Sequence, residues 1–365
     1  MSSRVANTYL PDQVSLPGET LQEILDDRQM SQAELAERTG RPKKTINEIV
    51  KGKTAITAET ALQLERVLGM PASFWNNLER NYQEFLARKR EEELLQESTS
   101  WLNEVPVAAL ERYGWIERRS RKVDKVKEVL SFFGVASPSE WQQVFQVPQA
   151  SFRHSASFKS ESGALAAWLR KGELMAQEIR CAQFERGRLQ EALEAARALT
   201  AEEPDVFKPA LVSLCAEAGV AVAFVPELPK CRAHGLTRWI SPTKALIQLS
   251  FRYKTDDHLW FTFFHEAGHI LLHGKRLIFI EAGSASSAPE EDEANRFASD
   301  FLIPREALER LRAPAQRKRL SEALVRDFAE SVGVAPGIVV GRLQHEGWLP
   351  HTHLNGLKVR LEWTD

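Results

Sequence analysis

The chain has 365 residues and a mass of 41.3 kDa, which exceeds one ordinary domain and predicts about two or three. Hydrophobic residues make up 43% and charged residues 27%, a globular composition that excludes a fibrous protein and extensive disorder. The formal net charge of -2 excludes a uniformly basic coat for nucleic acid and leaves room only for a local basic face.

The cysteines and the apolar runs indicate the compartment. Cys181, Cys215 and Cys231 are widely spaced, odd in number and form no CxxC pair, which excludes a disulfide framework and is typical of a reduced environment. The N-terminal stretch lacks the apolar centre of a signal peptide, and no apolar run has the length of a membrane span. We therefore expect a cytoplasmic protein that makes no membrane contact.

Residues 17–98 are predicted to form an all-helical bundle, because apolar residues recur there every three to four positions. Ser31 and Glu34 have the form of a capping box, and Gly40 interrupts the helical pattern nine residues after Ser31. Pro42 stands where the next helix begins. Two short helices joined by a tight turn are expected, at helix-turn-helix spacing. A last helix runs into the charged stretch ARKREEELLQES, which predicts a boundary near residue 98.

A basic face is concentrated around the second of these short helices. Six Arg and Lys residues lie between positions 38 and 53, against one acidic residue, Glu48. Ile46, Ile49 and Val50 are expected to face the bundle, which leaves the polar residues of this helix outward. This basic face predicts DNA binding, with base-edge contacts from Lys43, Lys44 and Asn47, and phosphate contacts from Gln32, Lys51 and Lys53. The alternative is a purely structural bundle whose basic face is only solvated.

The stretch SQAELAERTGRPKKTINEIVKGK resembles the Cro/C1-type helix-turn-helix modules, and with TAITAETALQLERVLGMPASFWNNLERNYQ it is most similar to HigA-type antitoxins. The resemblance implies a double-stranded DNA operator as partner. Because such modules usually bind two-fold sites as dimers, a homodimer is expected. The family often has Ser or Thr where this chain has Pro42, so the second helix lacks a side-chain cap.

Three further segments follow. Residues 99–204 keep a helical pattern without a catalytic cluster and are predicted to be a helical adaptor. Residues 205–350 are predicted to form the next domain, and residues 351–365 a C-terminal tail. Three β-rich runs predict a small sheet at 219–226, 235–240 and 244–251. An apolar helix, LWFTFFHEAGHILLH, and a second helix, EDEANRFASDFLI, come after them.

The pentapeptide HEAGH carries the clearest chemical signal. Two histidines four positions apart on a helix differ by about 40° around its axis, so His265 and His269 can face one metal ion. Glu266 lies at the edge of that face, where it can reach a metal-bound water without being a ligand, as a general base must. Zinc in such a site takes three protein ligands and keeps one position for water, so the third ligand must come from elsewhere.

The second helix offers that ligand. Glu291 shares a face with Ala294 and Ala298, whose small side chains permit close approach. Glu293 points roughly 160° away from Glu291, so only one of them can face the metal, and we predict Glu291. Asn295, one turn further on, is predicted to bind the outer nitrogen of a ligating histidine.

A purely structural role is the alternative interpretation for HEAGH and for the other histidines near it. HEAGH can be an ordinary helix with two buried histidines, but its apolar surroundings would leave polar groups that need partners, and a metal supplies them. His273 continues the four-residue spacing but precedes Gly274 and Lys275, so we expect it to close the helix rather than bind the metal. His234 and His258 are expected in core or surface roles, with lining of the cleft as the alternative.

The motif HEAGHILLHG followed by ExEANxFAxxxLxP is similar to the ImmA/IrrE metallopeptidases, intracellular zinc proteases that cleave repressor proteins. The resemblance covers about residues 205–345. In that family the two His and the Glu of the ExxA motif bind zinc, and the Glu of HExxH is catalytic. It therefore implies that His265, His269 and Glu291 hold Zn2+ here and that Glu266 is catalytic. All four positions have the required residue types.

The expected fold is α+β and predominantly helical, with a helix-turn-helix bundle, a helical adaptor and a zincin-like domain whose HExxH helix accompanies a small sheet. The resemblances imply a DNA-binding transcriptional regulator with a zinc endopeptidase domain. It would cleave a repressor, an antitoxin or itself in stress response, phage defence or toxin-antitoxin control. One alternative is a DNA-binding antitoxin or autorepressor whose zinc domain is a non-proteolytic sensor or partner-binding module. Another is a zinc protein whose DNA-binding module only anchors it beside its substrate and has no regulatory role of its own.

One residue and two segments are expected to serve the cleavage reaction. Glu266 would take the proton of the attacking water and pass it to the leaving amine. The run KALIQLS is expected to be an edge strand that aligns an extended substrate by main-chain hydrogen bonds. The loop 281–290, rich in small residues, is expected to gate the cleft.

Overall fold

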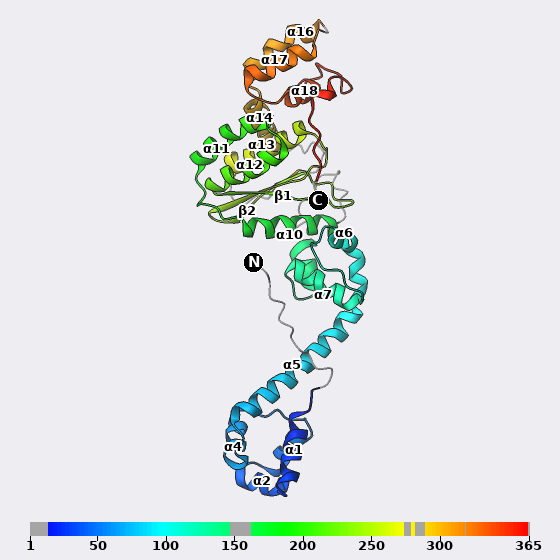
Figure 1. Cartoon of the computed structure of the whole chain (residues 1–365), viewed down its shortest axis with the longest axis vertical. Coiled ribbons are helices and arrows are strands. Elements are labelled where there is room, and N and C mark those ends of the chain that lie inside the picture. Colours follow the sequence, from blue (N-terminus) through cyan, green and yellow to red (C-terminus); the bar gives the residue numbers. More distant parts are fainter. Residues whose placement is uncertain (1–13, 147–161, 274–278, 282–288, 318, 364–365) are drawn as a thin grey trace. The chain divides into compact units, whose positions relative to one another are not determined.

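The computed structural model describes residues 14–146, 162–273, 279–281, 289–317 and 319–363 (Figure 1). The chain forms two compact units, Met1–Thr99 and Ser100–Asp365. Among the described residues, no helix is both long and apolar enough to cross a membrane.

In the described residues of the first unit, α-helices are joined by short turns. The Ser31 hydroxyl accepts a hydrogen bond from the Glu34 amide at 3.1 Å, and Gly40 ends the same helix with a left-handed φ of 70°. The predicted cap and turn are therefore confirmed. The next helix starts after Pro42 and has no side-chain cap. The five helices are α1 (Pro17–Asp27), α2 (Gln32–Thr39), α3 (Lys43–Val50), α4 (Ala58–Leu68) and α5 (Ala72–Glu97).

These helices enclose a core of their own. Leu21 and Leu25 of α1 pack with Ile46 and Ile49 of α3, and Trp75 of α5 is fully buried among them. The predicted inward face of α3 is confirmed. Because Ile46 and Ile49 face the core, the polar side of α3 is directed outward.

The second unit contains the remaining elements. The first of them is the short 3-10 helix Thr99–Glu104, whose first residue is the last residue of the first unit. The following helices precede the sheet: α6 (Val107–Arg112), α7 (Lys122–Phe133), α8 (Pro138–Trp141), a short π-helix (Gln142–Gln146), α10 (Ser162–Glu178), α11 (Arg186–Ala198), the 3-10 turn Leu199–Ala201 and α12 (Pro204–Glu217). The later helices are α13 (Asp256–Leu272), α14 (Pro289–Leu302), α15 (Arg305–Leu308), the 3-10 turn Glu309–Leu311, α16 (Arg312–Gln316), α17 (Glu322–Val332), α18 (Pro336–His345) and the 3-10 turn Asn355–Leu357.

A four-stranded sheet has the order β1-β3-β2-β4. Its strands are β1 (Val220–Phe224), β2 (Gly235–Ser241), β3 (Lys244–Leu249) and β4 (Phe279–Glu281). β3 pairs with β1 in parallel and with β2 in antiparallel, and β4 pairs in antiparallel with β2. The three predicted strands and the predominantly helical α+β class are confirmed, and β4 was not predicted.

The prediction that KALIQLS is an edge strand is wrong. β3 is hydrogen-bonded on both sides, so its main chain has no free edge for a substrate. Five of its six residues are buried, as expected for an interior strand covered on both faces. The nearly continuous apolar run was the sign of this position, because a strand with one solvated face alternates between apolar and polar residues.

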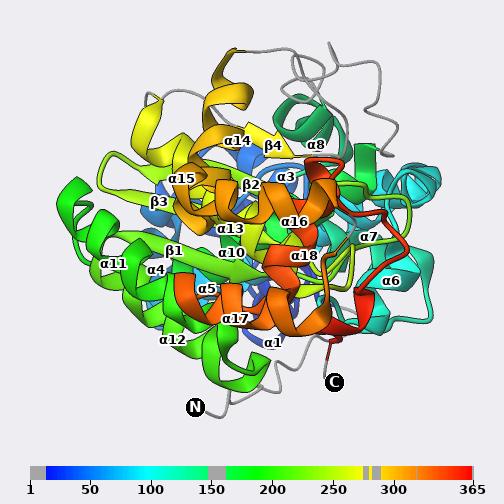
Figure 2. The ribbon, with the colours of Figure 1, turned by 90° about the horizontal axis from the view of Figure 1, so that it is seen from above.

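Helices cover both faces of the sheet. α10 packs on one face, while α12 and α13 pack on the other, with α11 beside α12 (Figure 1). Figure 2 shows the unit from the side of α17 and α18, which lie on the same side of the sheet as α13. The Gln248 amide nitrogen on β3 donates to the carbonyl of Trp168 on α10 at 2.7 Å. The segment expected to be an adaptor thus supplies two helices to these layers.

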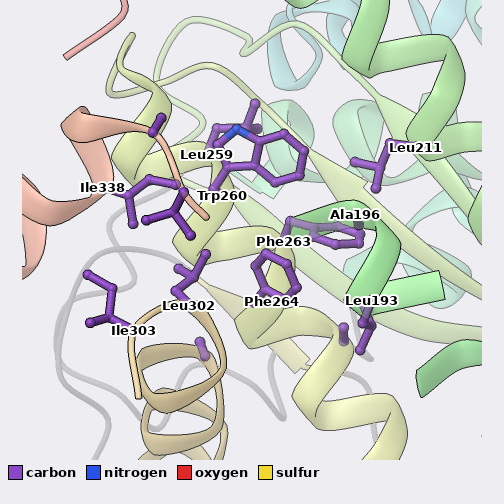
Figure 3. Close-up of a cluster of buried hydrophobic side chains, with 14 of the residues drawn as sticks. Leu193, Ala196, Leu211, Leu259, Trp260, Phe263, Phe264, Leu302, Ile303 and Ile338 are labelled. Atoms are coloured by element: carbon purple, nitrogen blue, oxygen red, sulfur yellow. The ribbon is translucent and has the colours of Figure 1, made fainter. Parts of the chain in front are cut away.

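The core of this unit surrounds α13. Trp260, Phe263 and Phe264 of α13 pack with residues of α11, α12, α14 and α18 (Figure 3). Most of α13 is buried around its full circumference, as is typical of a helix that is apolar on all sides. The polar residues of HEAGH therefore lie inside the unit rather than at its surface.

The C-terminal segment returns to the start of α13. The Val359 amide donates to the Asp256 carboxylate at 3.0 Å, and the Lys358 ammonium lies 2.7 Å from the Asp257 carboxylate. Burial raises the pKa of Asp256 to about 7, and the charge of Asp257 acts in the same direction. The residues predicted as a tail are thus docked on the helix that carries HEAGH.

The three cysteines carry free thiols. Cys215 and Cys231 are buried, and Cys181 is half-buried. Burial raises the pKa of the Cys215 thiol to about 12 and that of Cys231 to about 11. Burial also raises the pKa of Cys181.

Candidate functional site

Three side chains from α13 and α14 converge at one point. His265 Nε2 lies 3.0 Å from His269 Nε2 and 3.3 Å from Glu291 Oε2. His269 Nε2 lies 3.7 Å from Glu291 Oε1. Both imidazoles are buried, while Glu291 is partly exposed. The structure thus brings together the three residues that the sequence proposed as ligands.

Small residues allow the two helices to approach. A Cβ added at Gly268 would lie 3.0 Å from the ring of Phe297 and 3.4 Å from the Cα of Ala294. Ala294 and Ala298 are fully buried. Since neither helix has a larger side chain at these positions, Glu291 is carried to the His265 and His269 rings.

This group fits a tetrahedral metal ion. Bonds of about 2.0–2.1 Å in a tetrahedral zinc site place neighbouring donor atoms about 3.3–3.4 Å apart. The donor distances of 3.0, 3.3 and 3.7 Å bracket that value. Two imidazole nitrogens and one carboxylate also form a three-ligand set that leaves one position open.

The outer nitrogens of both histidines have partners. Asn295 Oδ1 lies 3.0 Å from His265 Nδ1, as expected for Asn295. His273 Nδ1 lies 3.0 Å from His269 Nδ1, and His273 Nε2 lies 3.4 Å from Glu293 Oε2. His273 does end α13, as expected, but sequence reasoning missed its contact with His269. The four-residue spacing was the signal that it lies beside that ring.

Glu266 is fully buried and lies against strand β2. The Thr237 hydroxyl donates to the Glu266 carbonyl at 2.9 Å, which holds the helix backbone beside the strand. A Cβ added at Gly235 would lie 2.5 Å from Glu266 Oε1. The absence of a side chain at residue 235 therefore makes room for the Glu266 carboxylate.

A cleft of about 870 Å³ opens beside this group. α13, α14 and α18 line it, and His265, Glu291 and Asn295 form part of its wall. His234 and His258 also line the cleft, which was the alternative to the core or surface roles expected for them. Tyr253 stacks on His258 with 4.4 Å between ring centroids. Most of the loop expected to gate the cleft, residues 282–288, lies outside the described residues.

In the first unit, the expected DNA-contact residues fall into two groups. Lys43, Lys44, Lys51 and Lys53 are exposed, with Lys44 3.8 Å from Glu48. Asn47 and Gln32 instead contact one another across the motif: the Asn47 amide donates to Gln32 at 3.1 Å. Gln32 in turn donates to Gln22 of α1 at 2.7 Å. This amide chain fixes α3 against α2 and α1.

Fold and site define the class of protein: a helix-turn-helix bundle joined in one chain to a metallopeptidase-like unit. Residues 21–75 match the helix-turn-helix family model, and residues 230–344 match the model described as the IrrE N-terminal-like domain. The chain therefore combines a domain of the helix-turn-helix family with a domain of the IrrE N-terminal-like family, as the sequence predicted.

Three solved structures are similar to part of the chain. The first is an antidote protein of a plasmid maintenance system from Nostoc punctiforme, with 30% identity over 24% of this chain and 94% of that one, at a TM-score of 0.23. A HigA-family addiction module antidote from Coxiella burnetii has 31% identity over 23% and 94%, at 0.22. The Pseudomonas aeruginosa antitoxin HigA, solved with the higBA promoter, has 30% identity over 23% and 94%, at 0.22. No curated protein matches the chain.

Proposed function

We propose that the second unit is a zinc-dependent endopeptidase and that the chain is a DNA-binding regulator that cleaves a repressor, an antitoxin or itself. The observation that carries the proposal is the convergence of His265, His269 and Glu291 beside an open cleft, with Glu266 next in sequence to the first ligand. Stress response, phage defence and toxin-antitoxin control are the settings that such a combination suits.

The residues of the chain divide the work of peptide hydrolysis. A bound Zn2+ would lower the pKa of water and polarise the scissile carbonyl. His265, His269 and Glu291 would hold the ion. Glu266, buried against β2, would accept the proton of the attacking water and return it to the leaving amine. The cleft volume of about 870 Å³ is at the upper end of the range for ligand sites and suits a peptide segment.

Replacement of the general base tests the enzyme proposal. Glu266→Gln keeps the size of the side chain but cannot accept a proton, so cleavage should be abolished while Zn2+ binding and the fold persist. New protein N-termini in cells expressing wild type or Glu266→Gln would be compared by mass spectrometry, with and without DNA damage. A cleavage found only with wild type names the substrate. Identical N-termini in both would contradict the proposal and favour a zinc domain that senses or binds a partner.

For the first unit, we propose binding to a two-fold double-stranded DNA operator as a homodimer. The exposed Lys43 and Lys44 on α3, with Lys51 and Lys53 after it, form the basic face that supports this proposal. Asn47 would read a base edge, and Gln32 would contact phosphate while holding the Asn47 amide.

Base reading and phosphate binding are separable by substitution. Lys43→Ala with Asn47→Ala should reduce the preference for the operator over unrelated DNA, because base contacts carry about 1–3 kcal/mol each. Lys53→Ala should instead weaken binding to both DNAs and lower its salt dependence. Titrations of operator and random DNA at two salt concentrations would measure this. Unaltered operator preference in the double variant would refute the assignment of α3.

A further inference from the structure

We propose that His273 and Glu293 form a positioning relay for the ligand His269. The relay runs from His269 Nδ1 to His273 Nδ1 at 3.0 Å, and from His273 Nε2 to Glu293 Oε2 at 3.4 Å. The inference rests on the metal site of the proposed function but not on its peptidase activity.

The proton positions in this relay follow from its two ends. His269 turns Nε2 toward His265 and Glu291, so metal binding requires a lone pair on Nε2 and a proton on Nδ1. His269 Nδ1 then donates to His273 Nδ1, which must accept. The proton of neutral His273 therefore sits on Nε2, which faces a carboxylate oxygen of Glu293. Each nitrogen thus has one role, and the relay ends on an acceptor.

The other ligand histidine is held by a shorter arrangement of the same kind. His265 turns Nε2 toward Glu291 and has Asn295 Oδ1 3.0 Å from its Nδ1. The amide oxygen can only accept, so it sets the same tautomer in His265. Both imidazoles are therefore oriented from behind, one by Asn295 and the other by His273. Such outer partners fix the ring and raise its basicity toward the metal.

The relay also joins the ends of two helices. His273 closes α13, while Glu293 and Asn295 both belong to α14. His273 has 6% of its side chain exposed and Glu293 53%, so the relay leads from the buried site to solvent. Glu291 and Glu293 point to different sides of α14 but thus serve the same site. Glu291 lies beside Nε2 of His265 and His269, and Glu293 lies beside His273, the partner of His269 Nδ1.

Zinc affinity and histidine tautomers, measured on the full chain, test the relay without any substrate. His273→Leu removes the acceptor, and Zn2+ affinity measured by competition with a chromogenic chelator should fall about 10–100-fold. His273→Gln offers an amide oxygen, as Asn295 does, and should recover much of that loss. Glu293→Gln should weaken affinity less than His273→Leu does. His353→Leu and Glu322→Gln, on exposed residues elsewhere, are the controls and should bind Zn2+ like wild type.

Nitrogen-15 NMR of the zinc-loaded wild type should show the proton on Nδ1 in His265 and His269 and on Nε2 in His273. Zn2+ affinity within twofold of wild type in folded His273→Leu would overturn the proposal, as would a proton on Nδ1 of His273. If His273→Leu does not fold, His273→Gln and Glu293→Gln decide by the same readouts. If the relay passes these tests but the chain cleaves no protein, only the enzyme proposal is refuted. If wild type binds no Zn2+, the relay and the enzyme proposal are both overturned.

Discussion

Gly235 is the residue on which the position of the Glu266 carboxylate depends. It opens β2, and a Cβ there would lie 2.5 Å from both Glu266 Oε1 and the methyl carbon of Thr262. Both neighbours belong to the buried helix α13, so neither can move into solvent. A single added methyl group would therefore have to displace the Glu266 carboxylate or separate the strand from the helix.

We expect Gly235→Ala to abolish cleavage and to lower the free energy of unfolding by about 1–3 kcal/mol, as overpacking does. Zn2+ affinity should stay near that of wild type, because His265, His269 and Glu291 do not contact the added methyl. Urea unfolding, a chelator competition and a cleavage assay would be run together. Gly356→Ala is the matched control, since a Cβ there meets no atom within 4 Å. Full cleavage activity in Gly235→Ala would disprove the close packing.

At the scale of elements, α13 is held at both ends. Its first residues, Asp256 and Asp257, bind Val359 and Lys358 of the returning C-terminal segment. His273, the residue that caps its C-terminal end, lies beside Glu293 of α14. Gly337 and Gly341 of α18 leave room for the two aspartates, because a Cβ at either would come within 2.5 Å of a carboxylate oxygen. The helix that carries HEAGH therefore depends on segments far from it in sequence.

The docking at Asp256 predicts a pH-dependent stability. Its pKa is about 7 in the folded chain against an ordinary value of 3.8, so folding takes up a proton between these pH values. The contribution is fully present below about pH 4, and the free energy of unfolding falls as pH rises toward 7 and beyond, by about 4 kcal/mol at most. Asp257, whose charge also raises the pKa of Asp256, is itself paired with Lys358 at 2.7 Å.

We expect Asp256→Asn to remove this decline, since an amide oxygen can still accept from Val359 and carries no charge. Urea unfolding at pH 4, 6 and 8 would measure the difference between variant and wild type. Asp327→Asn, at an exposed position of α17, should keep the wild-type decline. Parallel pH profiles for Asp256→Asn and wild type would contradict the prediction.

At the scale of the molecule, the chain contains two units with separate cores. Trp75 is fully buried in the first core and Phe207 is buried in the second, and no residue belongs to both clusters. The free energy that stabilises one core is therefore expected to be independent of the other.

We expect Trp75→Ala to destabilise the first unit by about 3–5 kcal/mol and to weaken DNA binding, while Zn2+ affinity stays unchanged. Phe207→Ala should destabilise the second unit and weaken Zn2+ binding, while DNA binding stays unchanged. Thermal unfolding followed by calorimetry, with DNA and zinc titrations of each variant, would measure both effects. Loss of Zn2+ affinity in Trp75→Ala would show that the two units fold as one.

Local signals sufficed for much of this fold and for the pairing of His265 with His269, whereas Glu291 was predicted from the face of a second helix and from the resemblance to the ImmA/IrrE metallopeptidases. Ser31, Gly40 and the HEAGH spacing act over one or two helical turns, so sequence alone reveals them. The interior position of β3 and the docking of residues 354–361 depend on long-range packing, which no short window contains. His273 was visible as a third histidine at four-residue spacing, but its partner Glu293 could be recognised only once α14 lay beside the end of α13.

The raised pKa values of the thiols have a practical consequence for labelling. Cys215 and Cys231, with pKa values of about 12 and 11 and buried sulfurs, hold almost no thiolate at neutral pH. A maleimide dye should therefore attach slowly to the half-buried Cys181 alone in the native protein. Since all three cysteines lie in the second unit, the stoichiometry of attached dye would rise from one to three only when that unit opens, and would report its unfolding while the first unit contributes no signal.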